Sequence, residues 1–252
     1  MKIGLFSDSH YCKESALEGT RLCSLSLGKI HDAMEYFVSH GADLVLCLGD
    51  MTDAGDDTEA NHGCIREISS LIRSYDVPFV LAAGNHDFKA AEILQFRVLS
   101  GLETPLYICD TDEYRIITLD ANYESDMKHY SPDGFNWMDT NLPEEQLAFL
   151  RDALASADRE CIIALHEPIN EAAGDCYRVK NAKEIKKIIK DSGKVRLVIQ
   201  GHKHEYEDAV EDGIRYITVV GMCEGEPNRF MMLDIDRTHI KPEVITMPSD
   251  KE

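Results

Sequence analysis

Short apolar runs recur along this chain of 252 residues, and stretches with the periodicity of a helix separate most of them. The apolar runs are Ile3–Phe6, Leu44–Leu48, Pro78–Ala82, Arg115–Leu119, Cys161–Leu165 and Val195–Ile199. The stretches with helical periodicity are Gly28–His40, Ile65–Tyr75, Glu144–Ala155 and Ala182–Asp191. Because a short, continuous apolar run is typical of a strand buried on both faces, this alternation predicts an α/β fold in which helices cover largely buried strands.

The pattern changes after His204, where short strands separated by turns are expected. These strands are Asp208–Val210, Ile214–Val219, Arg229–Ile235 and His239–Ile245. The sequence EDGI at Glu211–Ile214 favours a hairpin turn between the first two. We therefore expect this part of the chain to form the antiparallel half of a sheet.

Three long stretches lack regular periodicity, namely Tyr11–Leu27, Asn122–Asn141 and Glu167–Asn181. Each follows an expected strand that ends in a polar residue. Loops of this length in a compact domain are usually functional or disordered. Since no linker, repeat or low-complexity segment is visible, we interpret residues 1–252 as one domain with these loops gathered at one end of the sheet.

Side chains that bind metals follow five of the expected strands directly. The five motifs are FSDSH, LGDMTD, AGNHD, ALHEP and GHKH, which contain Asp8, His10, Asp50, Asp53, Asn85, His86, His166, His202 and His204. In an open α/β sheet the carboxyl ends of the strands form the ligand crevice. Residues i and i+2 of an extended chain project to the same side. Asp8 with His10, and His202 with His204, can therefore each direct two ligands into one space.

This set contains only carboxylates, imidazoles and one amide, and it is too large for a single tetrahedral zinc. It suits a pair of divalent ions bridged by a carboxylate, with Mn, Fe, Zn or Ni as candidates. The expected chemistry is in-line displacement at phosphorus, in which two ions roughly 3.5–4 Å apart clamp the phosphoryl oxygens and supply a bridging hydroxide. The remaining histidines are interpreted as packed or solvated residues, namely His31, His40, His62, His129 and His239.

Charge and cysteine usage restrict the partners and the compartment. The 26 basic and 46 acidic residues give a formal net charge of −20, which argues against a protein that coats nucleic acid or an anionic membrane. A small anionic substrate stays possible, because bound metal ions reverse the local field. The eight cysteines form no CxxC pair, and we expect a reducing, cytoplasmic location. No apolar stretch is long enough to span a bilayer.

The ordered series D-x-H, GD-x-x-D, GNHD, a lone histidine after a strand, and GHxH resembles the calcineurin-like metallophosphoesterase superfamily. The resemblance runs from Asp8 to His204 and implies a four-layer αββα sandwich of two mixed sheets, with two metals at the crest of the sheets. By motif it implies that one metal is held by Asp8, His10, Asp50 and His204. It implies that the second is held by Asn85, His166 and His202, with Asp50 bridging the two.

The same resemblance assigns His86 to chemistry rather than to metal binding. Beside Asn85, it can donate a proton to the leaving oxygen or stabilise the developing charge. Asp53 corresponds to the family position that orients this histidine and raises its pKa. Asp87 is interpreted as a turn residue or as a support for the ligands.

Two details bear on the substrate. In the serine/threonine protein phosphatase branch the second motif reads GDxxDRG, whereas this chain has GDMTDAG, with Ala54 in place of the arginine that grips phosphate. That branch also has Glu where this chain has Asp87, so protein phosphatase activity is not expected. The segments after His166 and His204 resemble class III cyclic-nucleotide phosphodiesterases and manganese-dependent ADP-ribose/CDP-alcohol pyrophosphatases. The resemblance implies that the substrate contacts Asn85 and His86 and a nucleotide-side wall of Tyr11, Asn122, Cys176, Asn181 and Met222.

Three functions of different classes follow. The first is a dinuclear phosphodiesterase or pyrophosphatase acting on small nucleotide-like substrates, and the second is a phosphomonoesterase with the same metals. The third is a non-catalytic binding protein, against which the full ligand set and His86 argue. We favour the first, because Ala54 removes an arginine and the loop Glu167–Asn181 has only Arg178 and Lys180 to grip a dianionic monoester. A nuclease is disfavoured, since the chain lacks the basic track that a polynucleotide needs.

Overall fold

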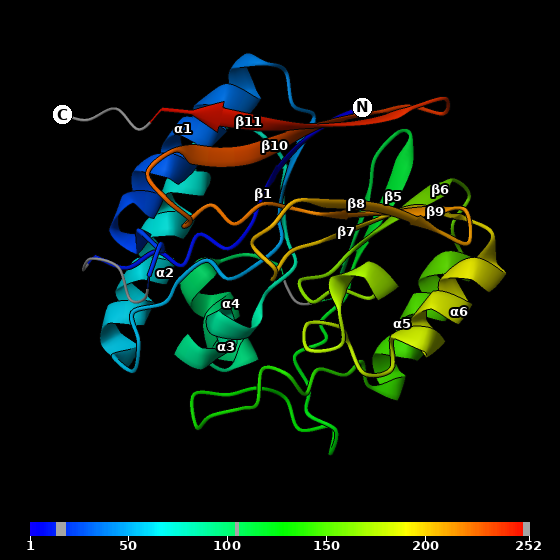
Figure 1. The fold of residues 1–252 in the computed structure, drawn as a ribbon, viewed down its shortest axis with the longest axis horizontal. Coiled ribbons are helices and arrows are strands. Elements are labelled where there is room, and N and C mark those ends of the chain that lie inside the picture. Colours follow the sequence, from blue (N-terminus) through cyan, green and yellow to red (C-terminus); the bar gives the residue numbers. More distant parts are fainter. Residues whose placement is uncertain (14–18, 104–105, 249–252) are drawn as a thin grey trace.

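The computed structural model describes residues 1–13, 19–103 and 106–248, and its strands form two sheets (Figure 1). The first sheet has the strand order β11-β10-β1-β2-β3. Its members are β1 (Lys2–Phe6), β2 (Leu44–Cys47), β3 (Phe79–Leu81), β10 (Asn228–Ile235) and β11 (Ile240–Met247). Strands β1, β2 and β3 are parallel, whereas β10 runs antiparallel to β1 and to β11. The sheet is therefore mixed.

The second sheet has the order β4-β5-β6-β7-β9-β8. Its members are β4 (Tyr107–Asp110), β5 (Tyr114–Thr118), β6 (Glu160–Ala164), β7 (Val195–Gln200), β8 (Glu207–Glu211) and β9 (Ile214–Thr218). The four inner strands β5, β6, β7 and β9 are parallel, and each edge strand is antiparallel to its neighbour. The carboxyl ends of the parallel strands therefore meet at one edge of the sheet.

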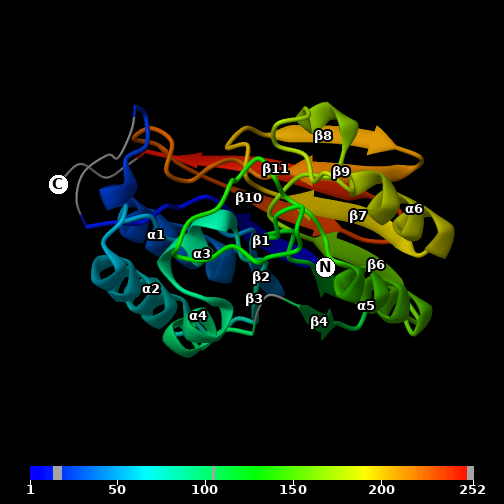
Figure 2. The same cartoon turned by 90° about the horizontal axis from the view of Figure 1, so that it is seen from below.

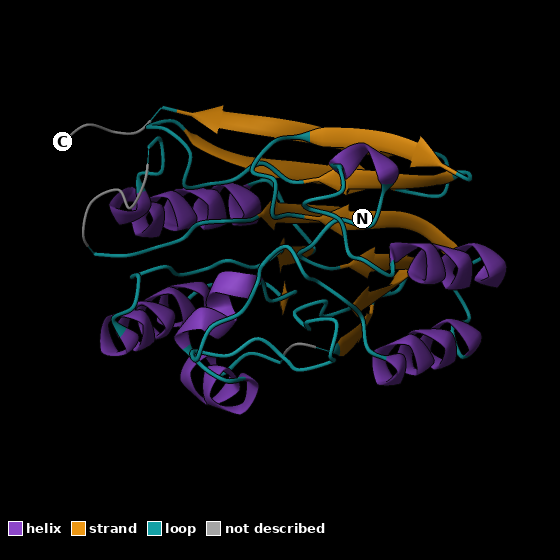
Figure 3. Cartoon of the chain, turned by 60° about the horizontal axis from the view of Figure 1, so that its bottom comes forward, coloured by secondary structure: helices purple, strands orange, loops and turns teal. Residues whose placement is uncertain are grey.

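The helices lie in two groups, one for each sheet (Figures 2 and 3). The first group is α1 (Ser26–Ser39), α2 (Thr58–Ile72), α3 (Asn85–Ala90) and α4 (Ile93–Ser100), and the second is α5 (Glu144–Ala155) and α6 (Ala182–Ser192). Two short 3₁₀ turns are Cys23–Leu25 and Glu171–Ala173. The elements thus stack as helices, sheet, sheet and helices. The α/β class and the four-layer sandwich of two mixed sheets are confirmed.

Alternation along the strands explains the layers. In β1, Ile3 and Leu5 belong to the apolar cluster that both sheets share, whereas Phe6 packs with the first helix group. Gly4 faces the same helices, and a Cβ there would lie 2.5 Å from the ring of Phe37 on α1. A strand with apolar neighbours on both faces reads as a continuous apolar run, which is why these strands were recognisable in the sequence.

The prediction that the C-terminal strands form one antiparallel half of a sheet is wrong. The predicted hairpin exists, but β8 and β9 extend the second sheet, and β9 runs parallel to β7. Strands β10 and β11 instead complete the first sheet beside β1. The physical reason is that a hairpin pattern fixes local pairing and does not specify which sheet edge accepts the strand.

Other differences are local. Helix α2 begins at Thr58 rather than Ile65, because the Asp57 side chain caps it by accepting a hydrogen bond from Ala60 N. Strand β4 and helices α3 and α4 were not predicted. Of the three long loops, the first includes residues 14–18, which lie outside the described residues. Within the described ranges, no helix combines the length and the apolar character that a bilayer crossing requires.

Candidate metal centre

The candidate ligands come together from strand ends of both sheets. Asp8 and His10 follow β1, Asp50 follows β2, and Asn85 begins α3 shortly after β3. From the second sheet, His166 follows β6, and His202 and His204 follow β7. Because these strands are parallel within each sheet, their carboxyl ends meet along one line, which we call the crest.

The backbone at the crest is unusual. Among the described residues, seven that are not glycine have a positive φ, and five of them are crest residues: Asp8, His10, Asp50, His202 and His204. Their φ values lie between 44° and 72°, the left-handed region that L-residues avoid at a cost of about 1–2 kcal/mol each. Backbone strain of this kind is retained where the surrounding structure imposes it, and it clusters at functional sites.

Asp50 lies between two groups of imidazoles. Its Oδ2 is 3.5 Å from Nε2 of His10 and 3.3 Å from Nε2 of His166. Its Oδ1 accepts a hydrogen bond of 2.8 Å from the backbone N–H of His86. One carboxylate is therefore shared by the two groups.

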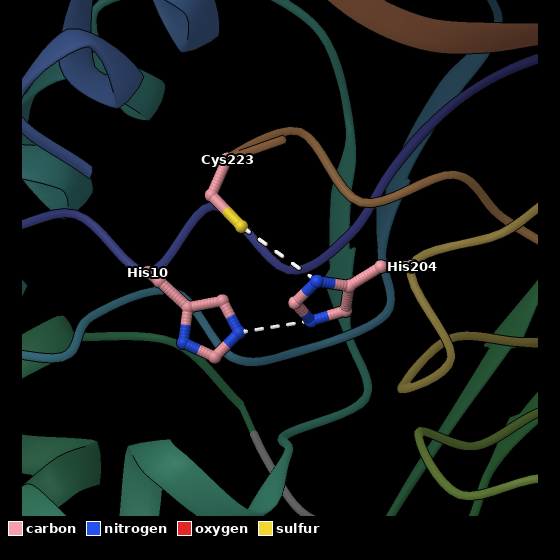
Figure 4. A group of neighbouring side chains, drawn as sticks. All are labelled: His10, His204 and Cys223. Atoms are coloured by element: carbon pink, nitrogen blue, oxygen red, sulfur yellow. Dashed lines mark hydrogen bonds between the residues drawn. The ribbon is translucent and has the colours of Figure 1, made fainter. Parts of the chain in front are cut away.

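The first group consists of Asp8, His10 and His204. Nε2 of His204 is 3.2 Å from Nε2 of His10 and 3.3 Å from Oδ1 of Asp8. The other ring nitrogen of His204 faces away, toward Cys223 Sγ at 3.8 Å (Figure 4) and toward Glu224 Oε1 at 2.7 Å. A carboxylate on the far nitrogen fixes the tautomer and orientation of a metal-binding histidine, so Glu224 positions His204.

The second group consists of His166, His202 and Asn85. Nε2 of His166 lies 3.1 Å from Nδ1 of His202, and Nδ1 of His166 contacts the carbonyl oxygen of Leu48. Nδ1 is therefore the ring nitrogen of His202 that faces this group, and Oδ1 of Asn85 is buried with no hydrogen-bond partner among the described residues. A buried polar atom without a partner is uncommon, and a bound metal ion is one group that would satisfy it.

The electrostatics favour bound cations. Burial lowers the pKa of His10 to about 3, and His86 acts in the same direction. Burial and His166 likewise lower the pKa of His202 to about 3, so both rings are neutral, as metal ligands must be. Burial would raise the pKa of Asp50, but His166 and His86 outweigh it and hold that pKa well below its usual range. Burial would lower the pKa of His166 and of His204, but Asp50 outweighs it at His166 and Asp8 at His204, and both pKa values are raised. Protons on these two rings therefore balance the buried carboxylates, and divalent ions bound there would displace those protons.

The donor set therefore fits two divalent ions. Close approach at the crest also depends on Gly84, where a Cβ would lie 2.3 Å from Oδ1 of Asp50 and 2.8 Å from Cε1 of His166. No side chain other than hydrogen fits at this position without displacing both groups. His86 also lies near His10 and Asp50, with one donor atom of each within 4.8 Å of the others.

His86 and Asp53 form a pair at the edge of the crest. Nδ1 of His86 is 2.8 Å from Oδ2 of Asp53, and the His86 side chain is 21% exposed. Burial alone would lower the pKa of His86, but Asp50 and Asp53 outweigh it, so this pKa is raised. Against the opposing effect of burial, the hydrogen bond from His86 lowers the pKa of Asp53 to about 2. Asp53 therefore lies on the Nδ1 side of the His86 ring and leaves Nε2 without this contact.

Asp87 contributes more to the structure of the site than the sequence indicated. Its buried carboxylate accepts hydrogen bonds from the backbone N–H groups of Asp50 at 3.0 Å, Met51 at 2.9 Å and Gly84 at 2.9 Å. The first two belong to the loop after β2, and the third to the segment after β3. Asp87 therefore ties together the two loops that carry Asp50 and Asn85.

Two cavities open onto the crest. The larger, of about 1060 Å³, is lined by His10, Asp50, Asn85, His86 and His202 among others, and by Arg21, Lys89, Lys203 and Arg229. The smaller, of about 460 Å³, shares five of its lining residues with the larger: Gly55, Asn85, His86, Lys89 and Trp137. These four basic residues come from separate segments of the chain. Counting the basic residues of the loop Glu167–Asn181 alone therefore did not reveal them.

The five residues predicted for the nucleotide-side wall have other surroundings. Tyr11 is buried and its hydroxyl donates to Glu67, Met222 is fully buried, and Cys176 is exposed. The side-chain amides of Asn122 and Asn181 bond to the backbone of Ala83 and Leu142 respectively. None of the five lines either cavity in the described part of the chain.

The cavity walls contain residues that the sequence analysis missed. Trp137 and Tyr177 come from two of the long loops, Lys89 from α3, and Glu224 from the segment after β9. Trp137 is the single tryptophan of the chain and lies in one of the long loops expected to be functional or disordered, so its position could have indicated a role in the site. Tyr177 and Glu224 were each within two residues of a predicted wall residue.

Comparisons with known proteins agree with this geometry. The profile of a family described as calcineurin-like phosphoesterase matches residues 1–206. A probable cyclic nucleotide phosphodiesterase of Psychrobacter arcticus is 21% identical over 193 residues, which cover 72% of this chain and 63% of that protein. The 3',5'-cyclic adenosine monophosphate phosphodiesterase of Escherichia coli K12 is 25% identical over 188 residues, covering 73% and 62%. The matches thus span less than two thirds of the length of either relative.

Among solved structures, a dimetal phosphatase from Danio rerio has a TM-score of 0.83 at 17% identity, with 99% of both chains covered. This likeness shows a shared fold over the whole chain.

Proposed function

The chain belongs to the calcineurin-like phosphoesterase family, and on that premise we propose that it hydrolyses phosphodiester or pyrophosphate bonds of small nucleotide-like substrates with two divalent metal ions. The observation that carries the proposal is the position of Asp50, whose Oδ2 lies 3.5 Å and 3.3 Å from histidines of two separate groups. A carboxylate shared by two groups of histidine and oxygen ligands is an arrangement that suits a pair of ions.

The proposed ligands of one ion are Asp8, His10, Asp50 and His204. Those of the other are Asn85, His166 and His202, again with Asp50. Oxygen and imidazole donors of this kind suit Mn, Fe, Zn or Ni. When bound, such ions supply Lewis acidity that neutralises phosphoryl oxygens and makes water acidic enough to act as a nucleophile.

The chain's own side chains then have distinct tasks. Asp53 holds Nδ1 of His86, which leaves Nε2 of that ring as the position that can give a proton to the departing oxygen. The Lys89 ammonium lies 3.8 Å from Asp53 and lines both cavities, where it attracts an anionic substrate. These residues bind the substrate phosphate and protonate its leaving group.

The two cavities support a substrate with two organic substituents. They meet at Asn85, His86 and Lys89, so a phosphorus atom held there would have room for one substituent on each side. A simple monoester has only one substituent and would leave one cavity filled with water. The relatives named as cyclic nucleotide phosphodiesterases also act on diesters, although both ester oxygens of a cyclic nucleotide belong to one nucleoside. They support diester hydrolysis independently of the two cavities.

A phosphomonoesterase is the second candidate, and one observation favours it. Arg21, Lys89, Lys203 and Arg229 line the larger cavity, although the loop sequences are poor in basic residues. Cations of this kind could grip the dianion of a monoester, a task for which Ala54 offers nothing. These cations reduce the weight of Ala54 as evidence against a monoester, and the two adjoining cavities favour a diester more strongly.

The test compares esters that differ in the number of substituents. After reconstitution with Mn, Fe, Ni or Zn, kcat/KM is measured for bis-nitrophenyl phosphate and nitrophenyl phosphate. Cyclic AMP, ADP-ribose and CDP-alcohols follow, with Asp50→Asn as the inactive control. We expect the diesters and pyrophosphates to be hydrolysed faster. A clear preference for the monoester with every metal would assign the protein to the phosphomonoesterases, and no hydrolysis by fully loaded protein would leave only a binding role.

A further inference from the structure

Trp137 and Tyr177 meet at the rim of the larger cavity, although they belong to different loops. Trp137 lies in the loop between β5 and α5, and Tyr177 lies between β6 and α6. Their ring centroids are 5.9 Å apart with an angle of 41° between the planes. The loops are joined nearby by the hydrogen bond from Lys180 N to Thr140 O, at 2.8 Å. This hydrogen bond holds the two loops together, so the contact between the two rings has a defined geometry.

Both rings lie beside a proposed metal ligand. The centroid of His202 is 5.5 Å from that of Trp137 and 5.7 Å from that of Tyr177. The ammonium of the next residue, Lys203, lies 5.9 Å from the centroid of Tyr177. Trp137, Tyr177, His202 and Lys203 all line the larger cavity. We call these four residues the aromatic wall.

Within the aromatic wall, Trp137 is exposed to solvent and Tyr177 is half-buried. Trp137 is 38% exposed, whereas the large aromatic residues of the sandwich core, such as Tyr114, Phe88 and Phe96, are almost fully buried. An indole ring contributes a large apolar area, and leaving it exposed in a concave polar cavity forgoes the free energy that burial would give. Exposed apolar surface next to convergent polar groups is typical of a ligand site.

We propose that the aromatic wall is the subsite for the nucleobase of the substrate, which stacks on Trp137 and Tyr177 while its phosphate lies at the crest. The inference rests on the proposed function for the position of the phosphate. A planar base fits this wall because aromatic rings stack with one another through dispersion and through their quadrupoles. The Lys203 ammonium pairs with Glu207 and adds a cation that can contact the electron-rich face or the carbonyl oxygens of a base.

The test uses the single tryptophan as its probe. Protein loaded with Zn²⁺ is titrated with AMP and, separately, with ribose 5-phosphate, which has the same phosphate and sugar without the base. Indole emission is excited where adenine does not absorb. We expect AMP to quench Trp137 at concentrations at which ribose 5-phosphate leaves the emission unchanged. Equal responses to the two ligands would overturn the inference and indicate that the wall contacts sugar or phosphate.

Variants locate the subsite. Tyr177→Ala should weaken AMP binding roughly five- to a hundredfold, the range expected when one stacking partner of a base is lost, whereas Tyr177→Phe keeps the ring and should bind nearly as the parent does. Trp137→Ala, followed by competition against bis-nitrophenyl phosphate hydrolysis, should weaken AMP to a similar extent.

Tyr206 provides a matched control. It lines the same cavity and is 40% exposed, but its hydroxyl donates to Asp208, and it is not part of the aromatic wall. Tyr206→Ala should leave the affinity for AMP nearly unchanged. Weakening by Tyr206→Ala without weakening by Tyr177→Ala would contradict the inference.

The readout separates this inference from the proposed function, because quenching needs no turnover. If AMP quenches Trp137 selectively but the protein hydrolyses no diester, the base subsite is supported and the proposed enzymatic function is wrong. Hydrolysis of diesters without any selectivity for AMP over ribose 5-phosphate would do the reverse.

Discussion

At the scale of single residues, Asp50 couples the two halves of the candidate metal centre. If it bridges both ions, Asp50→Asn should lower the occupancy of both sites together. Elemental analysis after reconstitution should give close to two metal ions for the parent and well below one for the variant. Asp53→Asn is the matched control, because Asp53 lies in the same cavity and pairs with His86, and its metal content should stay near two. A parent protein that binds only one ion would exclude the dinuclear arrangement.

His86 should separate chemistry from metal binding. We expect His86→Ala to retain its metals and to lose kcat by roughly 10²–10⁴, the range for a positioned acid or base. The loss should be smaller for nitrophenolate, a leaving group that needs no proton. The measurement is kcat as a function of leaving-group pKa, with metal content determined on the same samples. Since His86 also lies near His10 and Asp50, simultaneous loss of metal and activity would show that it is a ligand.

The sequence indicated the candidate metal ligands but not the residues that line the cavities. Asp8, His10 and His202 could be predicted because each directly follows a recognisable strand, so its position depends on local structure alone. Trp137 and Glu224 depend on how long loops fold back over the crest. Such contacts involve residues far apart in the chain, and no local pattern encodes them.

At the scale of elements, Asp87 joins the loop after β2 to the start of α3. Asp87→Asn replaces one carboxylate oxygen with an N–H group, which cannot accept from the backbone donors of Asp50, Met51 or Gly84. Leaving such a donor unpaired costs about 1–3 kcal/mol. We expect a lower free energy of unfolding and weaker metal binding, measured by denaturant titration and by metal competition. The fully exposed Asp56 is the control, and Asp56→Asn should change neither quantity.

The helices and strands show the same difference between features set by the local sequence and features set by contacts between distant residues. Helix α5 was predicted at its observed bounds, because its apolar face repeats regularly over Glu144–Ala155. The sheet that each C-terminal hairpin joins was not predicted, because β10, which carries β11 at its other edge, pairs with β1, more than 200 residues earlier in the chain. Helices α3 and α4 were missed because they are only six and eight residues long.

At the scale of the whole molecule, the cores depend mainly on elements away from the crest. The apolar clusters between the sheets and beneath each helix group consist mostly of buried side chains on the strands and helices, and only a few members, such as Tyr11 and Met51, adjoin the ligands. We therefore expect chelation to leave the secondary structure intact, as seen by circular dichroism. Returning Mn²⁺ or Zn²⁺ should raise Tm with metal concentration, because ligands that bind only the folded state stabilise it by mass action. Loss of the fold on chelation would show that the metals are structural.

The left-handed backbone at the crest reverses the usual ranking of two substitutions. At His204, with φ of 61°, alanine would keep the strain, whereas glycine would relieve it. Metal-free His204→Gly should therefore be more stable than His204→Ala, by about 1 kcal/mol. At His166, a proposed ligand outside the positive-φ set, alanine should be the more stable of the pair. Denaturant titrations of the four variants would show whether the ranking changes between the two positions. In a scan with alanine alone, the change in the free energy of unfolding would combine the loss of the ligand with the retained backbone strain. Comparing alanine with glycine at the same position separates these two contributions.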